Sequence, residues 1–431
     1  MGIGQSADHR AFRNFLKYAG SIQAGSNYAF PGILDANGYP TSSPGQTIFG
    51  SLTLPDSYSG RWVLTWTGTG SLRLGRGDPG FTVHDGASFV SGSTQFNLNV
   101  VGTNPRVEFS FTTSPAASVS WNFDAGTYSG MANAVLCRLA DEGSEDVFNS
   151  DFIAKMVELN SRIIRGMDLS PANGGNLASY AYETPVAAFS YANERYAPGA
   201  WVGAITGTND YACSGAADTP GTWTHGETIQ GQIANANTSG TTTLDVAVRG
   251  AKNFLAYNGV AFGVGQLTAN KIITATYDAD IDAVIARTAV SGVVPHVSLD
   301  VHIALANELA CDLWYCFSPL ITDADVTTMT ARVRDTLNSG LCFYPELSNE
   351  VWNPGGGFVQ TGYFEAKGAA FGLPATSIQR IYGGYAKRVR EIMEIVADTW
   401  GARPGLKRVM AIQAYGGSAN TNSYRFKGDD L

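Results

Sequence analysis

The sequence predicts a chain of several domains, in which β domains are combined with an α/β domain. Residues 47–124 contain short runs in which apolar and polar residues alternate. Residues 125–196 and 295–431 alternate helix-like with strand-like segments, and residues 197–294 between them are rich in Gly, Thr, Asn and Ser. Apolar residues at every second position are typical of strands, and apolar residues at i, i+3 and i+4 are typical of helices. A chain of 431 residues is also long enough for two or three domains.

Residues 1–46 are predicted to form an N-terminal arm with one short helix. Phe12, Phe15 and Leu16 recur at helical spacing within residues 10–19, so this helix would be amphipathic. The N-terminal sequence contains no apolar stretch of signal-peptide length. We therefore expect synthesis in the cytoplasm, with assembly into a virion as one route to the exterior.

Residues 47–124 are predicted to form an antiparallel β sandwich. Their alternating runs are separated by Gly, Asp, Asn and Pro, the residues that favour turns. The runs lie at residues 61–67, 71–74, 81–84, 95–100 and 107–111. Trp62 in the first run is expected to pack in the core, because an aromatic residue in a strand is more often buried than bound to a ligand.

The first part of the α/β domain is expected over residues 125–196. In order, its elements are a lead-in strand at 135–139, a helix at 148–159 with Asn149 or Ser150 as N-cap, and a strand at 162–168. Asp168 ends this last strand. Its carboxylate would either bind substrate or serve the structure, by capping a loop or by pairing with Arg165, and both interpretations stay open.

Residues 197–294 are predicted to form a β domain inserted into the α/β domain. Strand-like pieces occur at residues 227–230, 242–248 and 271–277. A loop of this length without its own structure is improbable in a compact fold. The inserted domain would therefore lie at the rim of the α/β domain, on the face where its loops gather.

The α/β pattern returns over residues 295–431. In order, the predicted elements are a helix at 301–310, a strand at 312–317, a helix at 323–337 with Thr322 as N-cap, a strand that ends at Glu350, a helix at 376–400 and a strand at 409–415. Apolar residues form one stripe along the long helix, which predicts that this stripe packs in the core: Ile381, Tyr385, Val389, Ile392 and Val396.

The segment from Cys342 to Asn353 contains the most specific motif of the chain. It reads Cys-Phe-Tyr-Pro-Glu-Leu-Ser-Asn-Glu-Val-Trp-Asn, so an apolar strand ends in the pair Asn349 and Glu350 with Trp352 beside it. This segment resembles the fourth strand of retaining glycoside hydrolases of the large (β/α)8 clan. It is most similar to a bacterial and phage group of glycoside-hydrolase-like proteins with a small β domain before the barrel.

The resemblance implies a site as well as a fold. Glu350 would be the general acid/base, Asn349 would contact the sugar 2-hydroxyl group, and Trp352 would stack on a sugar ring. Three further residues near strand ends would bind substrate: Asp168, Gln413 and Tyr415. The fold would be a (β/α)8 TIM-type barrel, whose loops after the strands carry the active site.

Two observations indicate either that the expected barrel is partial or degenerate and inactive, or that the chain is a fragment or processed part of a longer protein. The chain ends at Leu431, just after the fifth expected strand, and its last glutamate, Glu394, lies on a helix. No residue therefore matches the nucleophile at the end of the clan's seventh strand. Glu346 lies ~13 Å from Glu350 along the strand, at ~3.3 Å per residue. We expect Glu346 to be a buried structural group, paired with Arg165.

Two functions follow as alternatives. The chain would act on or bind glycans, or it would be a structural or glycan-adhesive phage virion protein, such as a tail fibre, tail tip or spike component, with an inactive barrel. In both cases the partner is a glycan or polysaccharide, joined in the second case by other virion proteins or by further copies of the chain.

The composition of the chain argues against several other classes of protein function. The net charge of −9 disfavours nucleic-acid binding, which needs a cationic surface. No run approaches the ~20 apolar residues that a membrane span needs. The five cysteines lack the paired spacing of a metal site, and no nucleotide-binding glycine motif occurs. We expect neither a metal nor a cofactor.

Overall fold

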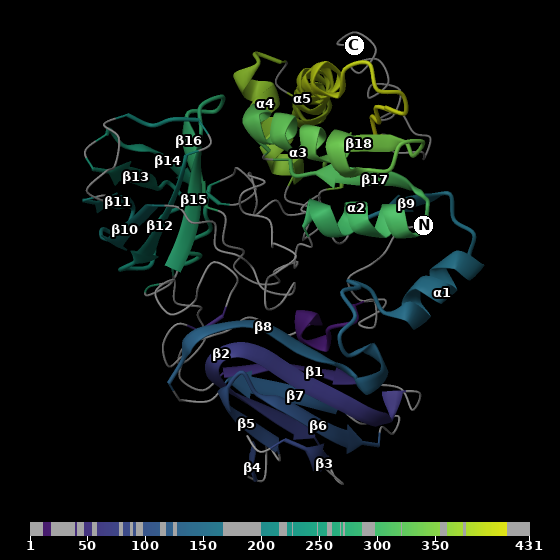
Figure 1. Cartoon of the computed structure of the whole chain (residues 1–431). Coiled ribbons are helices and arrows are strands. Elements are labelled where there is room, and N and C mark those ends of the chain that lie inside the picture. Colours follow the sequence, from purple (N-terminus) through teal and green to yellow (C-terminus); the bar gives the residue numbers. More distant parts are fainter. Residues whose placement is uncertain are drawn as a thin grey trace.

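Three β-sheets and five α-helices make up the described part of the chain (Figure 1). The computed structural model describes residues 12–18, 39–40, 47–53, 58–76, 81–86, 89–91, 98–112, 118–123, 127–166, 200–214, 222–225, 227–247, 249–256, 261–267, 269, 272–286, 298–319, 321–353, 360–373 and 376–411. An eight-stranded N-terminal sheet lies at one end of the molecule. A seven-stranded sheet and an α/β unit lie beside each other at the other end.

The N-terminal sheet is antiparallel and depends on one long strand. Its strands are β1 (Thr47–Thr53), β2 (Gly60–Arg76), β3 (Thr82–Asp85), β4 (Phe89–Ser91), β5 (Leu98–Thr103), β6 (Arg106–Phe111), β7 (Ser118–Phe123) and β8 (Ser129–Arg138). The first half of β2 pairs with β6 and β8, and its second half pairs with β5 and β7. Strand β2 therefore joins all parts of the sheet.

An aromatic core lies on one face of this sheet. Trp62, Leu64 and Trp66 occupy alternate positions of β2 and are all buried. Phe15 packs edge-on against Trp62, with ring centroids 4.7 Å apart, and Phe111 stacks on it at 5.3 Å. The prediction that Trp62 belongs to the core is confirmed.

Two predictions for this region are wrong. The expected sandwich of separate sheets is one continuous sheet, because β2 is long enough to pair along both of its halves. The strand expected at 135–139 does not lead into the α/β domain, because it belongs to β8 and pairs with β2. Strand β8 satisfies hydrogen-bonding groups that would otherwise stay exposed on an edge of β2.

The helix expected within residues 10–19 is shortened to a 3-10 helix, η1 (Phe15–Tyr18). Asn14 just before it is buried and bonds to β8: its Nδ2 donates to the Ala134 carbonyl, and its Oδ1 accepts from the Leu136 backbone. Side-chain bonds of this kind compete with helical ones. The next helix, α1 (Ser150–Glu158), confirms Asn149 as N-cap.

The second sheet closes on itself. Its strands are β10 (Ala200–Ile205), β11 (Asp210–Cys213), β12 (Thr228–Ile233), β13 (Thr243–Val246), β14 (Lys252–Leu255), β15 (Ile272–Asp278) and β16 (Ala283–Ala286), in the order β10-β12-β15-β16-β14-β13-β11. Thr206 and Ala212 exchange two backbone hydrogen bonds of 2.9 and 2.8 Å, which bring β10 and β11 together. Apolar side chains fill the interior, among them Ile205, Tyr211, Leu244, Phe254 and Val284.

The α/β unit has a three-stranded parallel sheet, β9 (Ile163–Arg165), β17 (Asp312–Phe317) and β18 (Phe343–Leu347). Its helices are α2 (Leu299–Glu308), α3 (Asp323–Thr336), α4 (Gln360–Ala370) and α5 (Ser377–Trp400). The expected strand at 312–317 and the N-cap Thr322 are confirmed. All five apolar residues expected in the stripe of α5 are buried, so that prediction is also confirmed.

The expected partial or degenerate (β/α)8 TIM-type barrel is wrong. Such a barrel needs strands and helices that alternate around a closed ring. The described chain is instead rich in strands that form several small sheets, and it has five α-helices. Strands β9 and β17 are neighbours, although the whole closed sheet lies between them in sequence. The parallel sheet in the described residues is therefore short and open.

The strand expected at 409–415 is present only as isolated pairing. Leu406 bridges to Phe343, and Val409 bridges to Glu346, both in parallel. The structure describes the chain as far as Ala411, so the remainder of the expected strand lies outside the described residues.

The packing of Trp62 leads to a stability prediction. Replacing Trp62 with alanine should lower the free energy of unfolding of the N-terminal sheet by about 3–5 kcal/mol, because it removes a fully buried aromatic ring. Urea denaturation followed by circular dichroism measures this loss. Val157→Ala, at a position that is 61% exposed, is the matched control and should change little. Equal stability of the two variants would contradict the core position of Trp62.

Candidate functional site

The carboxyl ends of the parallel strands bring polar side chains from three strands together. Arg165 ends β9, Trp314 lies opposite it on β17, and Glu346 of β18 lies opposite Cys316. In open α/β sheets, ligands bind beyond the carboxyl ends of the strands. In the described structure, a ligand site is therefore expected at this edge of the sheet.

Glu346 is fully buried and accepts several hydrogen bonds there. Its Oε2 accepts from Nη2 of Arg165 at 2.8 Å, from Nε1 of Trp314 at 2.7 Å and from Sγ of Cys316 at 3.3 Å. The Arg165 guanidinium also lies over the Trp314 ring, 5.0 Å from its centroid. The expectation that Glu346 is a buried group paired with Arg165 is confirmed.

The Cys316 thiol stays protonated in this environment. Burial raises the pKa of Cys316 well above its usual value, and the nearby negative charge of Glu346 raises it further. A protonated thiol can donate a hydrogen bond to the carboxylate, whereas a thiolate would repel it. Cys316 therefore supports the structure and is not a nucleophile.

The backbone after β18 has an unusual conformation. Ser348 and Glu350 both have positive φ angles, of 60° and 42°, although neither is glycine. Asn349 between them is 4% exposed, and its Oδ1 accepts a hydrogen bond of 3.0 Å from Nη2 of Arg165. The two left-handed residues thus turn Asn349 inward, toward Arg165.

Glu350 itself is half-buried at the edge. Its Oε2 accepts a hydrogen bond of 3.0 Å from Nδ2 of Asn353. The loop that carries Glu350 is held by the start of α4: Gln360 donates to the Asn349 carbonyl, and Thr361 donates to the carbonyls of Val351 and Asn353. The Glu350 side chain therefore projects from a loop with a defined shape.

Trp352 is half-buried and packs with one part against the core of the α/β unit. The structure thus brings Asn349, Glu350 and Trp352 together as neighbours in one loop. The other predicted site residues, Asp168, Gln413 and Tyr415, lie outside the described residues. Trp314 was missed by the sequence analysis. The sequence contains one sign of it: Trp314, whose indole N–H can donate a hydrogen bond, lies in a predicted strand. That this strand pairs with the one that carries Arg165 is seen only in the structure.

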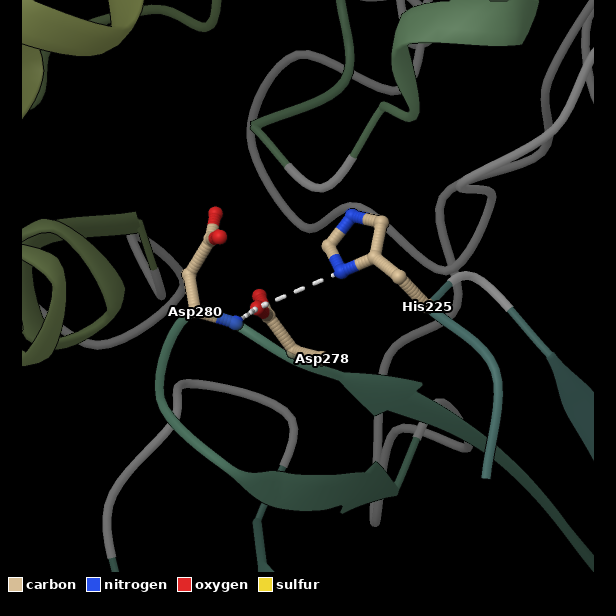
Figure 2. A group of neighbouring side chains, drawn as sticks. All are labelled: His225, Asp278 and Asp280. Atoms are coloured by element: carbon tan, nitrogen blue, oxygen red, sulfur yellow. Dashed lines mark hydrogen bonds and ion pairs between the residues drawn. The ribbon is translucent and has the colours of Figure 1, made fainter. Parts of the chain in front are cut away.

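A second polar cluster lies where the closed sheet meets helix α4. Ligand-type atoms of His225, Asp278 and Asp280 lie within 4.8 Å of one another (Figure 2). His225 lies in the segment before β12, Asp278 ends β15 and Asp280 lies in the turn after it, so the sequence analysis did not connect them. Carboxylate and imidazole groups at this spacing are also what a metal site requires.

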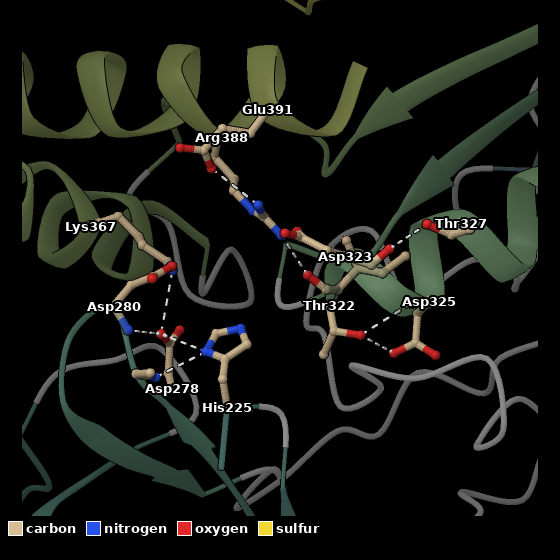
Figure 3. Close-up of polar contacts among 12 residues, drawn as sticks. His225, Asp278, Asp280, Thr322, Asp323, Asp325, Thr327, Lys367, Arg388 and Glu391 are labelled. Carbon is tan, nitrogen blue, oxygen red and sulfur yellow. Dashed lines mark hydrogen bonds and ion pairs between the residues drawn. The ribbon is translucent and has the colours of Figure 1, made fainter. Parts of the chain in front are cut away.

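A lysine supplies the cation in this cluster. Lys367 of α4 is 1% exposed, and its Nζ bonds to Asp278 Oδ1 at 3.3 Å and to Asp280 (Figure 3). Tyr363 Oη donates to the other oxygen of Asp278 at 3.0 Å, and His225 Nδ1 accepts from the Ala279 backbone at 3.0 Å. Lys367 and Tyr363 therefore already bind both oxygens of Asp278, and Lys367 supplies positive charge at the place where a metal ion would supply it.

The charge of Lys367 acts on its partners. Burial alone would raise the pKa of Asp280, but the hydrogen bond from Lys367 and its positive charge outweigh this effect, so the pKa is lowered. A separate set of ion pairs lies within the α/β unit, where Arg388 of α5 binds Asp323 at 2.7 Å and Glu391 at 3.1 Å (Figure 3). We interpret the cluster as an ionic joint between the closed sheet and the α/β unit.

Comparison of this chain with models of protein families, with curated proteins and with solved structures finds no match. The resemblance to glycoside hydrolases therefore has no support beyond the residues that carry it in the sequence. Among the described helices, none combines the length and the apolar character that crossing a membrane requires.

The ionic joint can be tested through Lys367. Lys367→Met should lower the free energy of unfolding by about 3–5 kcal/mol, because it leaves the buried carboxylate of Asp278 without its cation. The thermal unfolding midpoint and urea denaturation measure this loss. Adding Asp278→Asn to Lys367→Met should restore part of the stability, because the uncompensated charge is then also removed.

The matched control for the joint is Lys155→Met, which removes an exposed lysine from α1. It should change stability by less than about 0.5 kcal/mol, as is usual for surface positions. If Lys367→Met were as stable as Lys155→Met, the ionic joint would be disproved.

Proposed function

We propose that this protein binds glycans at the carboxyl ends of β9, β17 and β18. Glu350 is the hydrogen-bonding carboxylate of this site and Trp352 supplies an aromatic surface. Sugars combine many hydroxyl groups with apolar ring faces, so their binding sites pair charged hydrogen-bonding groups with aromatic rings. The glycoside-hydrolase resemblance of the same segment supports the proposal.

The observation that carries the proposal is the backbone around Asn349. Left-handed conformations are costly for residues with a Cβ atom, about 1–3 kcal/mol each, and they concentrate at functional sites. Ser348 and Glu350, which lie on either side of Asn349, both adopt this conformation. Glycine adopts this conformation without the cost, so we infer that the side chain of Glu350 is retained for a ligand.

We propose binding and not hydrolysis for the described chain. Retaining hydrolysis requires two carboxyl groups about 5–5.5 Å apart, one of them a free nucleophile. Glu346 is the nearest glutamate to Glu350 in sequence, and its Oε2 is held by Arg165 and Trp314. A carboxylate stabilised by a cation and an indole N–H is a poor nucleophile. The role in a virion stays a separate prediction, and a glycan-binding site is compatible with it.

Substitution of Glu350 tests the proposed function. In a polysaccharide array, followed by titration calorimetry with the best ligand, Glu350→Gln should weaken binding by about 10- to 100-fold, because hydrogen bonds to charged groups contribute about 1.5–3 kcal/mol. The control Glu394→Gln removes an exposed glutamate of α5 and should bind as the parent does. Equal affinity of Glu350→Gln and the parent would refute the site. Turnover of aryl β-glycosides that Glu350→Gln abolishes would show that the protein is a hydrolase instead.

Trp352 gives an independent test of the same site. Trp352→Ala should weaken glycan binding about tenfold, whereas Trp352→Phe should keep most of it, because a smaller aromatic ring can still stack on a sugar. Circular dichroism and thermal unfolding show whether each variant is folded. If Trp352→Ala bound glycan as well as the parent, the ring would have only a packing role.

A further inference from the structure

Arg249 of the closed sheet is a buried cation whose hydrogen bonds are incomplete. It lies in the turn between β13 and β14, and its side chain is 0% exposed. Its Nη1 donates to Oε1 of Glu227 at 2.6 Å, and Oε2 of Glu227 accepts from the Thr224 backbone. One end of the guanidinium is thus paired with a carboxylate.

The other edge of the same guanidinium has no partner among the described residues. Both Nε and Nη2 of Arg249 are buried and make no hydrogen bond to this part of the chain. These two nitrogens lie on one side of the planar group, and their N–H bonds point in the same direction. Buried polar groups are nearly always hydrogen-bonded, and an exception at a charged group requires an explanation. A two-donor edge of this kind matches the two oxygens of a carboxylate or phosphate.

Neighbouring aromatic rings hold the edge in place. The Trp223 ring lies over the guanidinium, 5.0 Å from its Cζ, and Trp223 stacks on Tyr277 with ring centroids 5.5 Å apart. Nε1 of Trp223 donates to the Gly250 carbonyl at 3.2 Å. Because Arg249 is fixed by the ring on one face and by Glu227 at one end, its free edge is positioned before any ligand arrives.

We propose that the Nε and Nη2 edge of Arg249 is a binding site for an oxyanion, with two parallel N–H···O bonds. The ligand would be the carboxylate of an acidic sugar or a free phosphate. The site lies in the closed sheet and does not involve the loop of Glu350, so it goes beyond the glycan site proposed above. Since the edge is buried, side chains around it must shift when the anion enters, and the fluorescence of the adjacent Trp223 should change.

Glu227 sets the strength of this site. Its negative charge neutralises Arg249 and repels an incoming anion, and its bond occupies Nη1. Replacing Glu227 with glutamine keeps the size of the side chain and removes the charge. The oxyanion should then bind several-fold more tightly, an effect that misfolding could not produce.

The test is titration calorimetry of the full chain with glucuronate, phosphate and glucose. We expect saturable binding of at least one of the two anions, whereas glucose carries no oxyanion and should not bind at Arg249, so that Arg249→Lys leaves any binding of glucose unchanged. Tighter binding of glucuronate than of phosphate identifies a glycan carboxylate as the ligand, and the reverse identifies a free phosphate. Arg249→Lys, which keeps the charge but lacks the two-donor edge, should bind at least tenfold more weakly.

The controls separate binding at Arg249 from a general attraction of anions to positive charge. Arg390→Lys changes an exposed arginine of α5 and should leave the binding of both anions unchanged. Trp223→Phe should remove the fluorescence change that accompanies binding while keeping most of the affinity. No saturable anion binding by either the parent or Glu227→Gln, or equal binding by Arg249→Lys and the parent, would overturn the proposal.

Discussion

The buried charge of Glu346 is the constraint on which the α/β unit depends. A carboxylate removed from water costs many kcal/mol unless a cation and hydrogen-bond donors compensate it. Glu346 of β18 obtains these donors from Arg165 on β9 and from Trp314 and Cys316 on β17. These bonds favour the observed order and register of the three strands, and the same Arg165 binds Asn349.

A similar constraint connects the closed sheet to this unit. The chain has only 15% charged residues, and it places several of them in buried contacts. Lys367 of α4 binds Asp278 at the end of β15 and Asp280 in the turn that follows. Ile285 of β16 also packs in the core of the α/β unit. Apolar contacts stabilise this junction. The ion pairs fix the position of the closed sheet relative to α4, because a buried charge without a partner is costly.

The two proposed sites use buried charges differently. At the parallel sheet, Arg165 pairs with Oε2 of the buried Glu346, and the half-buried Glu350 is a carboxylate at the edge that can meet a ligand. In the closed sheet, Glu227 satisfies only one end of Arg249. The first arrangement favours neutral sugars, which need acceptors and an aromatic surface. The second favours an anion that supplies two acceptors.

The sequence alone determined the local elements. The N-caps Asn149 and Thr322, the strand at 312–317 and the apolar stripe of the long helix follow from contacts within a few residues. The tertiary structure alone decided that β8 joins β2, that the second sheet closes, and that the α/β sheet is short and not a barrel. Of the sites, the loop of Glu350 could be predicted because its residues are neighbours in sequence. The ionic joint at Lys367 and the free edge of Arg249 could not be predicted. These strand pairings and ion pairs join residues that are far apart in sequence. They depend on which apolar surfaces and charges are buried together, and no local sequence pattern contains that information.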